Sequence, residues 1–230
     1  MVTDIMKICV TIVGVCRPSF ERVRENIESN IKYFTTTYPQ HQFTFILLAY
    51  KNTFYTELQE YCDSIKIQSY FIEHIKESDF VFPIIPRLSN MYRLFYSMNY
   101  ILDKIPVDMD CVIRIRLDTE IVNLEIPDNL SENTCYIVKE SDKRYSDNLM
   151  YGSYDVMKSV WAHKNCLISR IGQEEIIYTI VISQEYDIKR FKFHYRLYQS
   201  SDTVWDGVAQ WSKRSREWIY DGNTYVLRDL

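Results

Sequence analysis

The residues best suited to chemistry lie in the segment CVIRIRLDTEI, from Cys111 to Ile121. Apolar residues alternate with Arg114 and Arg116, which is the pattern of a buried strand, and Asp118 and Glu120 stand at its end. Carboxylate oxygens gathered at one strand end are typical of a site for Mn²⁺ or Mg²⁺ holding a diphosphate. Ligands of open α/β sheets bind beyond the carboxyl ends of strands, so this position favours a binding site.

An acidic residue after a strand is also a common turn former or helix N-cap. The two arginines of this segment favour the binding site, because a buried arginine is costly unless it is paired. Residues two apart on a strand share a face, so the arginines and the two carboxylates are expected on one charged face. A diphosphate site accounts for such a face better than a plain core does.

Composition and glycine usage exclude several classes of protein. The 230 residues, 47% of them hydrophobic and 25% charged, predict a globular chain with one domain over 1–230. The net charge of -4 does not favour nucleic-acid binding. The five glycines form no dinucleotide fingerprint, phosphate loop or nucleophile elbow. Six cysteines without a CxxC pair, and no long apolar run, predict reduced thiols in a cytoplasmic protein without a transmembrane segment.

The periodicity of apolar residues predicts the elements that must position these side chains. Expected strands, besides 111–121, are Lys7–Val15, Phe43–Tyr50, Ile65–Ile72, Cys135–Val138, Leu149–Gly152 and Arg190–Leu197. Expected helices are Ser19–Tyr38, Thr53–Ser64, Asn90–Lys104, Tyr154–His163 and Gln173–Gln184. This alternation predicts an α/β fold with a mostly parallel central sheet.

The sheet, the carboxylate pair and the lack of a glycine loop resemble a GT-A glycosyltransferase, a Rossmann-like three-layer sandwich. The stretch from Arg87 to Ile121 is similar to the WavE-type family of surface-polysaccharide synthesis. That family pairs an Asn-x-x-Arg helix with a strand ending in Arg-x-Asp, elements matched here by Asn90, Arg93, Arg116 and Asp118.

A second segment, from Ser146 to Trp161, resembles the same family's Asp-then-Gly segment through Asp147 and Gly152. Related single-domain enzymes also occur in large DNA viruses that glycosylate their own capsids, and the composition does not decide between these sources. The resemblance implies transfer of a hexosyl or deoxyhexosyl group from a nucleotide-sugar donor, with a UDP-sugar favoured. It also implies a glycan or lipid-linked acceptor, polysaccharide biosynthesis and an inverting reaction.

The resemblance further implies a divalent cation, Mn²⁺ or Mg²⁺, on a DXD-like motif formed by Asp118 and Glu120. Glu120 departs from the second aspartate of many GT-A enzymes, and metal-independent members of the superfamily exist. A late histidine commonly supplies a third metal ligand, and His194 is the candidate here. A lone histidine on a strand is also often structural.

The donor is expected at the end of the first strand. In a GT-A sheet, Val13, Gly14 and Cys16 would lie against the nucleotide base, and Arg17 with Arg93 would bond the phosphates. A further set implied by the resemblance to contact the donor is Asn90, Arg116 and Gly152.

A base must deprotonate the acceptor hydroxyl in an inverting transfer. Glu174 and Glu175 open a predicted helix roughly where GT-A enzymes carry this base, although carboxylates in a first turn also complement the helix dipole. Asp147 is the competing candidate. Two other functions remain open: a nucleotidyltransferase on the same sheet, and a catalytically inactive relative that binds glycans. The oligomeric state is not predicted.

Overall fold

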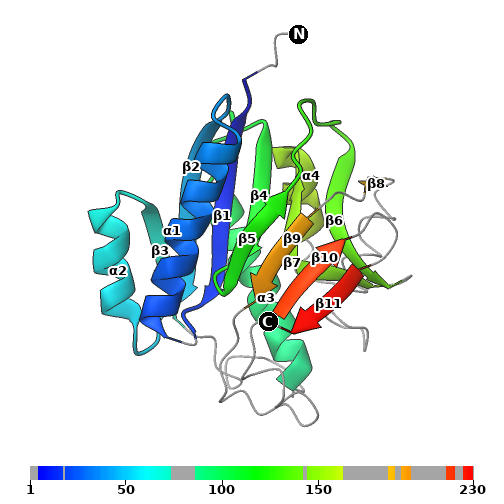
Figure 1. Ribbon diagram of the computed structural model, residues 1–230. Helices are drawn as coiled ribbons and strands as arrows, with labels where there is room; N and C mark the ends of the chain where they lie inside the picture. Colours follow the sequence, from blue (N-terminus) through cyan, green and yellow to red (C-terminus); the bar gives the residue numbers. More distant parts are fainter. Residues whose placement is uncertain are drawn as a thin grey trace.

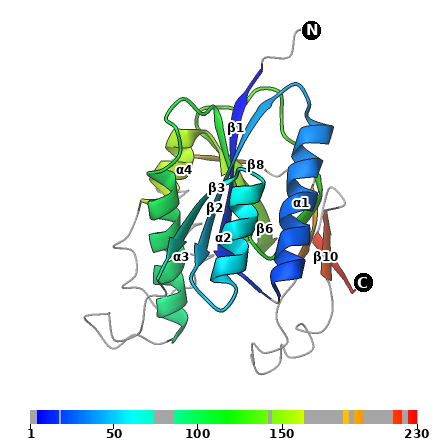
Figure 2. The same ribbon diagram turned by 90° about the vertical axis from the view of Figure 1, so that its left-hand side faces the viewer.

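The computed structural model describes residues 5–17, 19–73, 86–141, 144–162, 186–189, 193–197, 216–220 and 225–229. Side chains are described for 5–17, 19–73, 93–137, 149–162 and 186–187. Over these ranges the chain is a mixed α/β structure in which a central sheet lies between helices (Figures 1 and 2).

The central sheet has seven strands in the order β3-β2-β1-β4-β7-β6-β8. Their bounds are β1 Lys7–Val15, β2 Gln42–Tyr50, β3 Gln68–Ile72, β4 Cys111–Arg116, β6 Thr134–Ser141, β7 Arg144–Gly152 and β8 Asp187–Lys189. All neighbours pair in parallel except β7, which is antiparallel to β4 and to β6. The predicted α/β fold with a mostly parallel sheet is therefore confirmed.

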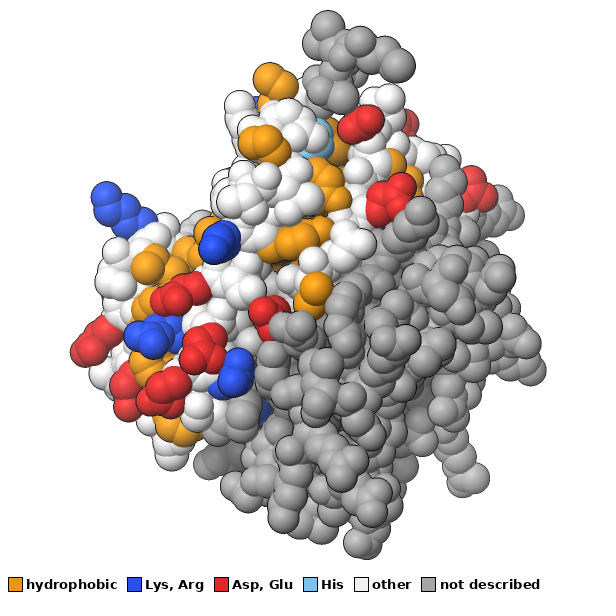
Figure 3. Space-filling view, viewed as in Figure 1, with side chains coloured by type: hydrophobic (Ala, Val, Ile, Leu, Met, Phe, Trp, Pro, Cys, Tyr) orange, Lys and Arg blue, Asp and Glu red, His pale blue; other side chains and the backbone are white. Residues whose placement is uncertain are grey.

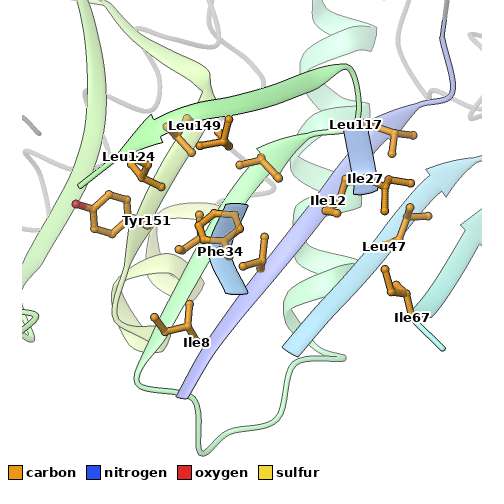
Figure 4. Close-up of a cluster of buried hydrophobic side chains, with 14 of the residues drawn as sticks. Ile8, Ile12, Ile27, Phe34, Leu47, Ile67, Leu117, Leu124, Leu149 and Tyr151 are labelled. Carbon is orange, nitrogen blue, oxygen red and sulfur yellow. The ribbon is translucent and has the colours of Figure 1, made fainter. Parts of the chain in front are cut away.

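Helices cover both faces of this sheet and separate two hydrophobic clusters. Their bounds are α1 Phe20–Thr37, α2 Tyr55–Ser64, α3 Pro86–Leu102 and α4 Tyr154–Trp161. One cluster packs α1 and α2 on the sheet, with Ile27, Phe34 and Leu47 among its members (Figure 4). The other packs α3 and α4 on the opposite face, around Phe95 and Trp161. Strand β1 contributes side chains to both clusters, because alternate residues of a strand point to opposite faces of the sheet.

Local signals in the sequence account for several element boundaries. The Ser19 hydroxyl caps α1 by accepting the Arg22 amide at 3.3 Å. After α2, Lys66 adopts a φ of 59°, which turns the chain so that β3 begins at Gln68 instead of Ile65. Helix α3 begins at Pro86 instead of Asn90, since proline suits the first turn of a helix.

The segment from Cys111 to Ile121 is not one strand, contrary to the prediction. It turns at Leu117 and Asp118, and Thr119–Leu124 forms β5 in a second sheet. That four-stranded sheet has the order β11-β10-β9-β5, with bounds β9 Phe193–Leu197, β10 Arg216–Tyr220 and β11 Tyr225–Asp229. Glu120 thus lies within β5 and not at the end of β4. Hydrogen bonds from α1 to Leu117, Thr119 and Ile121 stabilise this turn.

The remaining differences are mostly of length. Strand β6 extends beyond Val138 to Ser141, and β7 begins at Arg144 instead of Leu149. The predicted helix 173–184 lies outside the described residues. The five cysteines that the structure describes are buried and free, as expected. On the surface in Figure 3, acidic and basic side chains are intermixed, and α1 carries such pairs in Arg22–Glu25 and Arg24–Glu28.

Candidate active site

The candidate site lies where β1 and β4 end side by side. Val13 pairs with Arg116 at the end of the ladder, and the Leu117 amide donates to the Val13 carbonyl at 3.2 Å. Gly14 permits this close approach, because a β-carbon there would lie 3.3 Å from the β-carbon of Leu117. The turn that carries Asp118 is therefore packed directly on the end of β1.

Asp118 is buried and accepts hydrogen bonds from two arginines. Arg116 donates from Nε to Oδ1 at 2.9 Å and from Nη2 to Oδ2 at 2.7 Å. Arg17, from the loop after β1, places Nε and Nη2 each 3.0 Å from Oδ2. We call these three residues the Asp118 cluster. Only 3% of the Asp118 side chain is exposed, whereas 18% of Arg116 and 29% of Arg17 are exposed.

The electrostatics of the cluster favour an ionised aspartate. Burial alone would raise the pKa of Asp118, but the charges and hydrogen bonds of Arg116 and Arg17 outweigh it, so the pKa is lowered. Next to the cluster, burial raises the pKa of the Cys16 thiol to about 12, with a smaller contribution from Glu57. Burial therefore favours the neutral thiol form of Cys16.

Three asparagines fix the backbone around the cluster. Asn30 of α1, which is buried, donates to the Thr119 carbonyl at 2.8 Å and accepts from the Ile121 amide at 2.7 Å. Asn26, also on α1, donates to the Leu117 carbonyl at 3.5 Å. On the other side, Asn52 donates to the Cys16 carbonyl at 2.9 Å, which fixes the loop of Arg17. Sequence analysis missed all three, although two polar residues on the apolar face of a predicted helix are a usable signal.

Glu120 has different neighbours from Asp118. Its Oε1 accepts from the Ser29 hydroxyl of α1 at 2.9 Å. On its other side, the register of β5 and β9 places Arg196 opposite Glu120. His194 is opposite Asn123, five residues beyond Asp118 and so about 16 Å further along at the usual rise of a strand. The register therefore does not bring the backbone of His194 beside Asp118.

The described residues do not fit the divalent cation implied by the resemblance. Mg²⁺ and Mn²⁺ need several oxygen ligands, and a cation on Asp118 would lie beside two guanidinium groups. Within the described ranges, no group of three or more His, Cys, Asp and Glu side chains is placed to hold a metal ion. The metal roles of Asp118, Glu120 and His194 stay predictions.

The other residues predicted to bind the sugar donor lie at opposite ends of the sheet. The Tyr50 hydroxyl donates to the Arg93 carbonyl at 2.7 Å, which places this part of α3 at the end of β2. Asn90 lies on the same helix, with its side chain outside the described set. Gly152, in contrast, pairs with Val112 at the start of β4, away from the Asp118 cluster.

Side chains in β1 and β4 are more deeply buried than the prediction of a nucleotide-facing surface implies. Val13 and Cys16 belong to the two hydrophobic clusters, one on each face of the sheet. Arg114 shares a face of β4 with Arg116, as predicted. It is buried, however, and its guanidinium carbon Cζ lies 5.4 Å from the centroid of the Trp161 ring. Arg114 is therefore part of the core between β4 and α4.

The candidate bases are only partly within the described chain. Strand β7 runs antiparallel to β4 and pairs Leu149 with Ile115, so Asp147 lies further toward the end of β4 where the Asp118 cluster is. Glu174 and Glu175 lie outside the described residues. All three stay candidates.

A cavity of about 360 Å³ lies at the other end of the sheet, where β1 and β4 begin. It is lined by Met6, which precedes β1, by Asp110, which precedes β4, and by Ser153, which precedes α4. Met6 and Asp110 stand at the amino ends of the parallel strands β1 and β4, and Ser153 follows the antiparallel β7, so this cavity is distinct from the candidate site. No described helix is long and apolar enough to cross a membrane.

Comparison with known proteins finds similarity in structure only, at low sequence identity. No protein-family model and no curated protein sequence matches the chain. Among solved structures, the catalytic domain of Drosophila beta1,4-galactosyltransferase 7 with xylobiose matches at a TM-score of 0.48 and 8% identity. A mutant of that enzyme with manganese, UDP-Gal and xylobiose matches at a TM-score of 0.45 and 9% identity. Each match covers 81% of this chain and 65% of the other, which is less than two thirds of its length.

Proposed function

We propose that this protein is a glycosyltransferase that moves a sugar from a nucleoside-diphosphate sugar, preferably a UDP-sugar, to a glycan or lipid-linked acceptor. The observation that carries the proposal is the Asp118 cluster at the carboxyl edge of β1 and β4. Ligands of α/β sheets bind at this edge, and arginine forks match the oxygens of a diphosphate. Two members of the cluster, Arg116 and Asp118, also belong to the strand-end motif through which the sequence resembles the WavE-type family.

The role of the cluster in such a transfer is electrostatic. As the bond between the sugar and the diphosphate breaks, negative charge grows on the leaving diphosphate. Arg17 and Arg116 would stabilise that charge from positions fixed by Asp118, so little reorganisation is needed during the reaction. The predicted Mn²⁺ or Mg²⁺ has no part in this proposal, because the described residues do not fit it.

An acceptor hydroxyl must also lose its proton if the transfer inverts the anomeric carbon. Asp147, on the strand beside β4, and the pair Glu174 and Glu175 are the proposed bases. One of them would take the proton while the hydroxyl attacks the face opposite the leaving diphosphate.

A nucleotide panel separates this function from the alternatives. Thermal unfolding is followed with UDP, GDP and CMP, and product release is followed with the matching nucleotide sugars. Stabilisation by one nucleoside diphosphate, together with its release from the sugar donor, supports the proposal. Pyrophosphate release from UTP and a sugar phosphate would indicate a nucleotidyltransferase instead. Glycan binding without turnover of any donor would indicate an inactive relative.

A further inference from the structure

We propose that Asn52 is a positioning residue of the donor site, which fixes the loop after β1 and thereby sets Arg17 in place beside Asp118. The inference rests on the proposed function, because it takes Arg17 to contact the donor diphosphate. It extends the donor site to the segment that follows β2 and makes the affinity for the donor depend on that segment.

The loop that carries Arg17 begins where strand pairing ends. The ladder between β1 and β2 ends with the pair of Val15 and Tyr50. One residue further, the carbonyl of the buried Cys16 accepts a hydrogen bond of 2.9 Å from Nδ2 of Asn52. The carbonyl of Cys16 and the amide of Arg17 belong to one planar peptide unit. Asn52 therefore orients the peptide that leads into Arg17.

The same loop is anchored again on the other side of Arg17. The Ser19 hydroxyl accepts the Arg22 amide at 3.3 Å, and the Ser19 carbonyl accepts the Val23 amide at 3.2 Å, so this residue is fixed at the start of α1. Between the two anchors, Nε and Nη2 of Arg17 each lie 3.0 Å from Oδ2 of Asp118. A contact through two donors of one planar group tolerates little movement of the backbone that carries it.

The Asn52 side chain is oriented by the turn that leads into α2. Its Oδ1 accepts the Phe54 amide at 3.0 Å, and its backbone carbonyl accepts the Tyr55 amide at 3.1 Å. Because Oδ1 is taken by an amide donor, Nδ2 faces the Cys16 carbonyl, which needs a donor. Asparagine meets both demands, since its side chain carries one acceptor group and one donor group.

Two substitutions separate the anchor of the loop from the turn before α2. Asn52→Asp keeps an oxygen for the Phe54 amide but sets a second oxygen against the Cys16 carbonyl, so only the anchor is lost. Asn52→Ala loses both bonds. Asn129→Asp is the matched control, because it makes the same change at an exposed residue beside the cavity at the other end of the sheet. Thermal unfolding establishes that each variant is folded.

Calorimetric titration of the full chain with UDP measures the effect, with GDP as a second probe. Asn52→Asp and Asn52→Ala should each raise the dissociation constant by about three- to tenfold, which corresponds to the usual contribution of one hydrogen bond. Asn129→Asp should bind as the wild type does. In Arg17→Ala protein, Asn52→Asp should cause no further loss, because a residue that acts through Arg17 has nothing left to position. A general disturbance of the fold would instead weaken binding equally with and without Arg17.

A measurement on the wild type needs no substitution. Addition of UDP should shift the side-chain amide signals of Asn52 in a nitrogen-correlated NMR spectrum, because the loop that Asn52 holds contacts the ligand. The side-chain amide signals of Asn129 should stay in place. This comparison decides the inference even where a substitution at Asn52 prevents folding.

The outcomes separate this inference from the proposed function. An affinity for UDP that is unchanged in Asn52→Asp, or that falls by the same factor with and without Arg17, overturns the inference and leaves a glycosyltransferase intact. Binding of UDP without a shift of the Asn52 signals has the same meaning. Failure of both UDP and GDP to bind the wild type overturns the inference and the proposed function together.

Discussion

Arg116 holds Asp118, two residues further along the chain, with hydrogen bonds of 2.9 Å to Oδ1 and 2.7 Å to Oδ2. The pair spans the point at which β4 ends and the chain turns toward β5. This pair explains the Arg-x-Asp spacing in physical terms, because the arginine at the end of the strand orients the carboxylate of the turn. Arg17 then joins β1 to the same carboxylate.

Loss of the Asp118 charge should lower stability as well as activity. Asp118→Asn keeps the size of the side chain but removes the charge that both arginines face. We expect the free energy of unfolding to fall by about 1.5–3 kcal/mol, the usual contribution of hydrogen bonds to a charged group. Urea denaturation at neutral pH measures the change.

Asp108→Asn is the matched control for that variant. Asp108 pairs with Lys7 at 2.7 Å, but both side chains are exposed, and solvent screens such pairs. The control should unfold at the same urea concentration as the wild type. Equal losses in the two variants would show that the Asp118 cluster has no special role in stability.

Asn30 should contribute strongly to the stability of the turn that carries Asp118. Asn30→Ala leaves the Thr119 carbonyl and the Ile121 amide without their partner, at a cost of about 1–3 kcal/mol for each buried group. Asn30→Asp keeps an acceptor for the amide but loses the donor, so its effect should be smaller. Lys32→Ala, on the exposed side of α1, is the control and should leave the unfolding curve unchanged.

The cluster could be predicted in part because part of it is local. Arg116 and Asp118 are two residues apart, so a strand pattern is enough to place them together. Arg17 is 101 residues from Asp118 in sequence, and no local pattern connects them. The break between β4 and β5 was missed because the alternation of apolar residues continues through Leu117 and Ile121. Asn30 stabilises the break from α1, 91 residues away from Ile121.

The fold itself was more predictable than the site. Continuous apolar runs such as Lys7–Val15 predict a parallel strand buried on both faces, and β1 has this environment. Strands of the second sheet are short, and their pairing joins β5 to residues 69 to 78 positions later in the sequence. Such long-range pairing depends on packing and turn geometry, which the sequence pattern does not report.

Stability should also depend on pH through His41. Burial lowers the pKa of His41 despite an opposing effect of Asp128, and its Nδ1 accepts the Met6 amide at 3.3 Å. Because the folded pKa lies below the unfolded one, the unfolded chain binds more protons in the interval between them. Stability is therefore complete above the unfolded pKa of about 6.5 and falls as the pH drops through it.

His41→Asn tests this dependence, because its amide oxygen can accept the Met6 amide without titrating. The free energy of unfolding is measured between about pH 7 and pH 5, where histidine changes its charge. The wild type should lose stability more steeply than the variant over this interval. Parallel pH profiles for the two proteins would exclude His41 as the titrating group.

The identity of the base is tested by three isosteric substitutions. Asp147→Asn, Glu174→Gln and Glu175→Gln each remove one proposed carboxylate. Turnover should fall by about 10²–10⁴-fold in one of the three, the usual cost of losing a general base, with UDP affinity retained. Adjacent residues of a helix diverge by about 100°, so Glu174 and Glu175 should not both be sensitive. Full turnover in all three variants would count against an inverting transfer.

The most direct test of the account is release of nucleoside diphosphate from a panel of nucleotide sugars by the full chain, with product analysis by mass spectrometry. We expect that at least one donor, preferably a UDP-sugar, releases its diphosphate and transfers its sugar in the presence of EDTA. The same reaction should be lost in Arg116→Ala and kept in Arg24→Ala. Absence of release from every donor, with and without Mn²⁺, would contradict the proposed function itself.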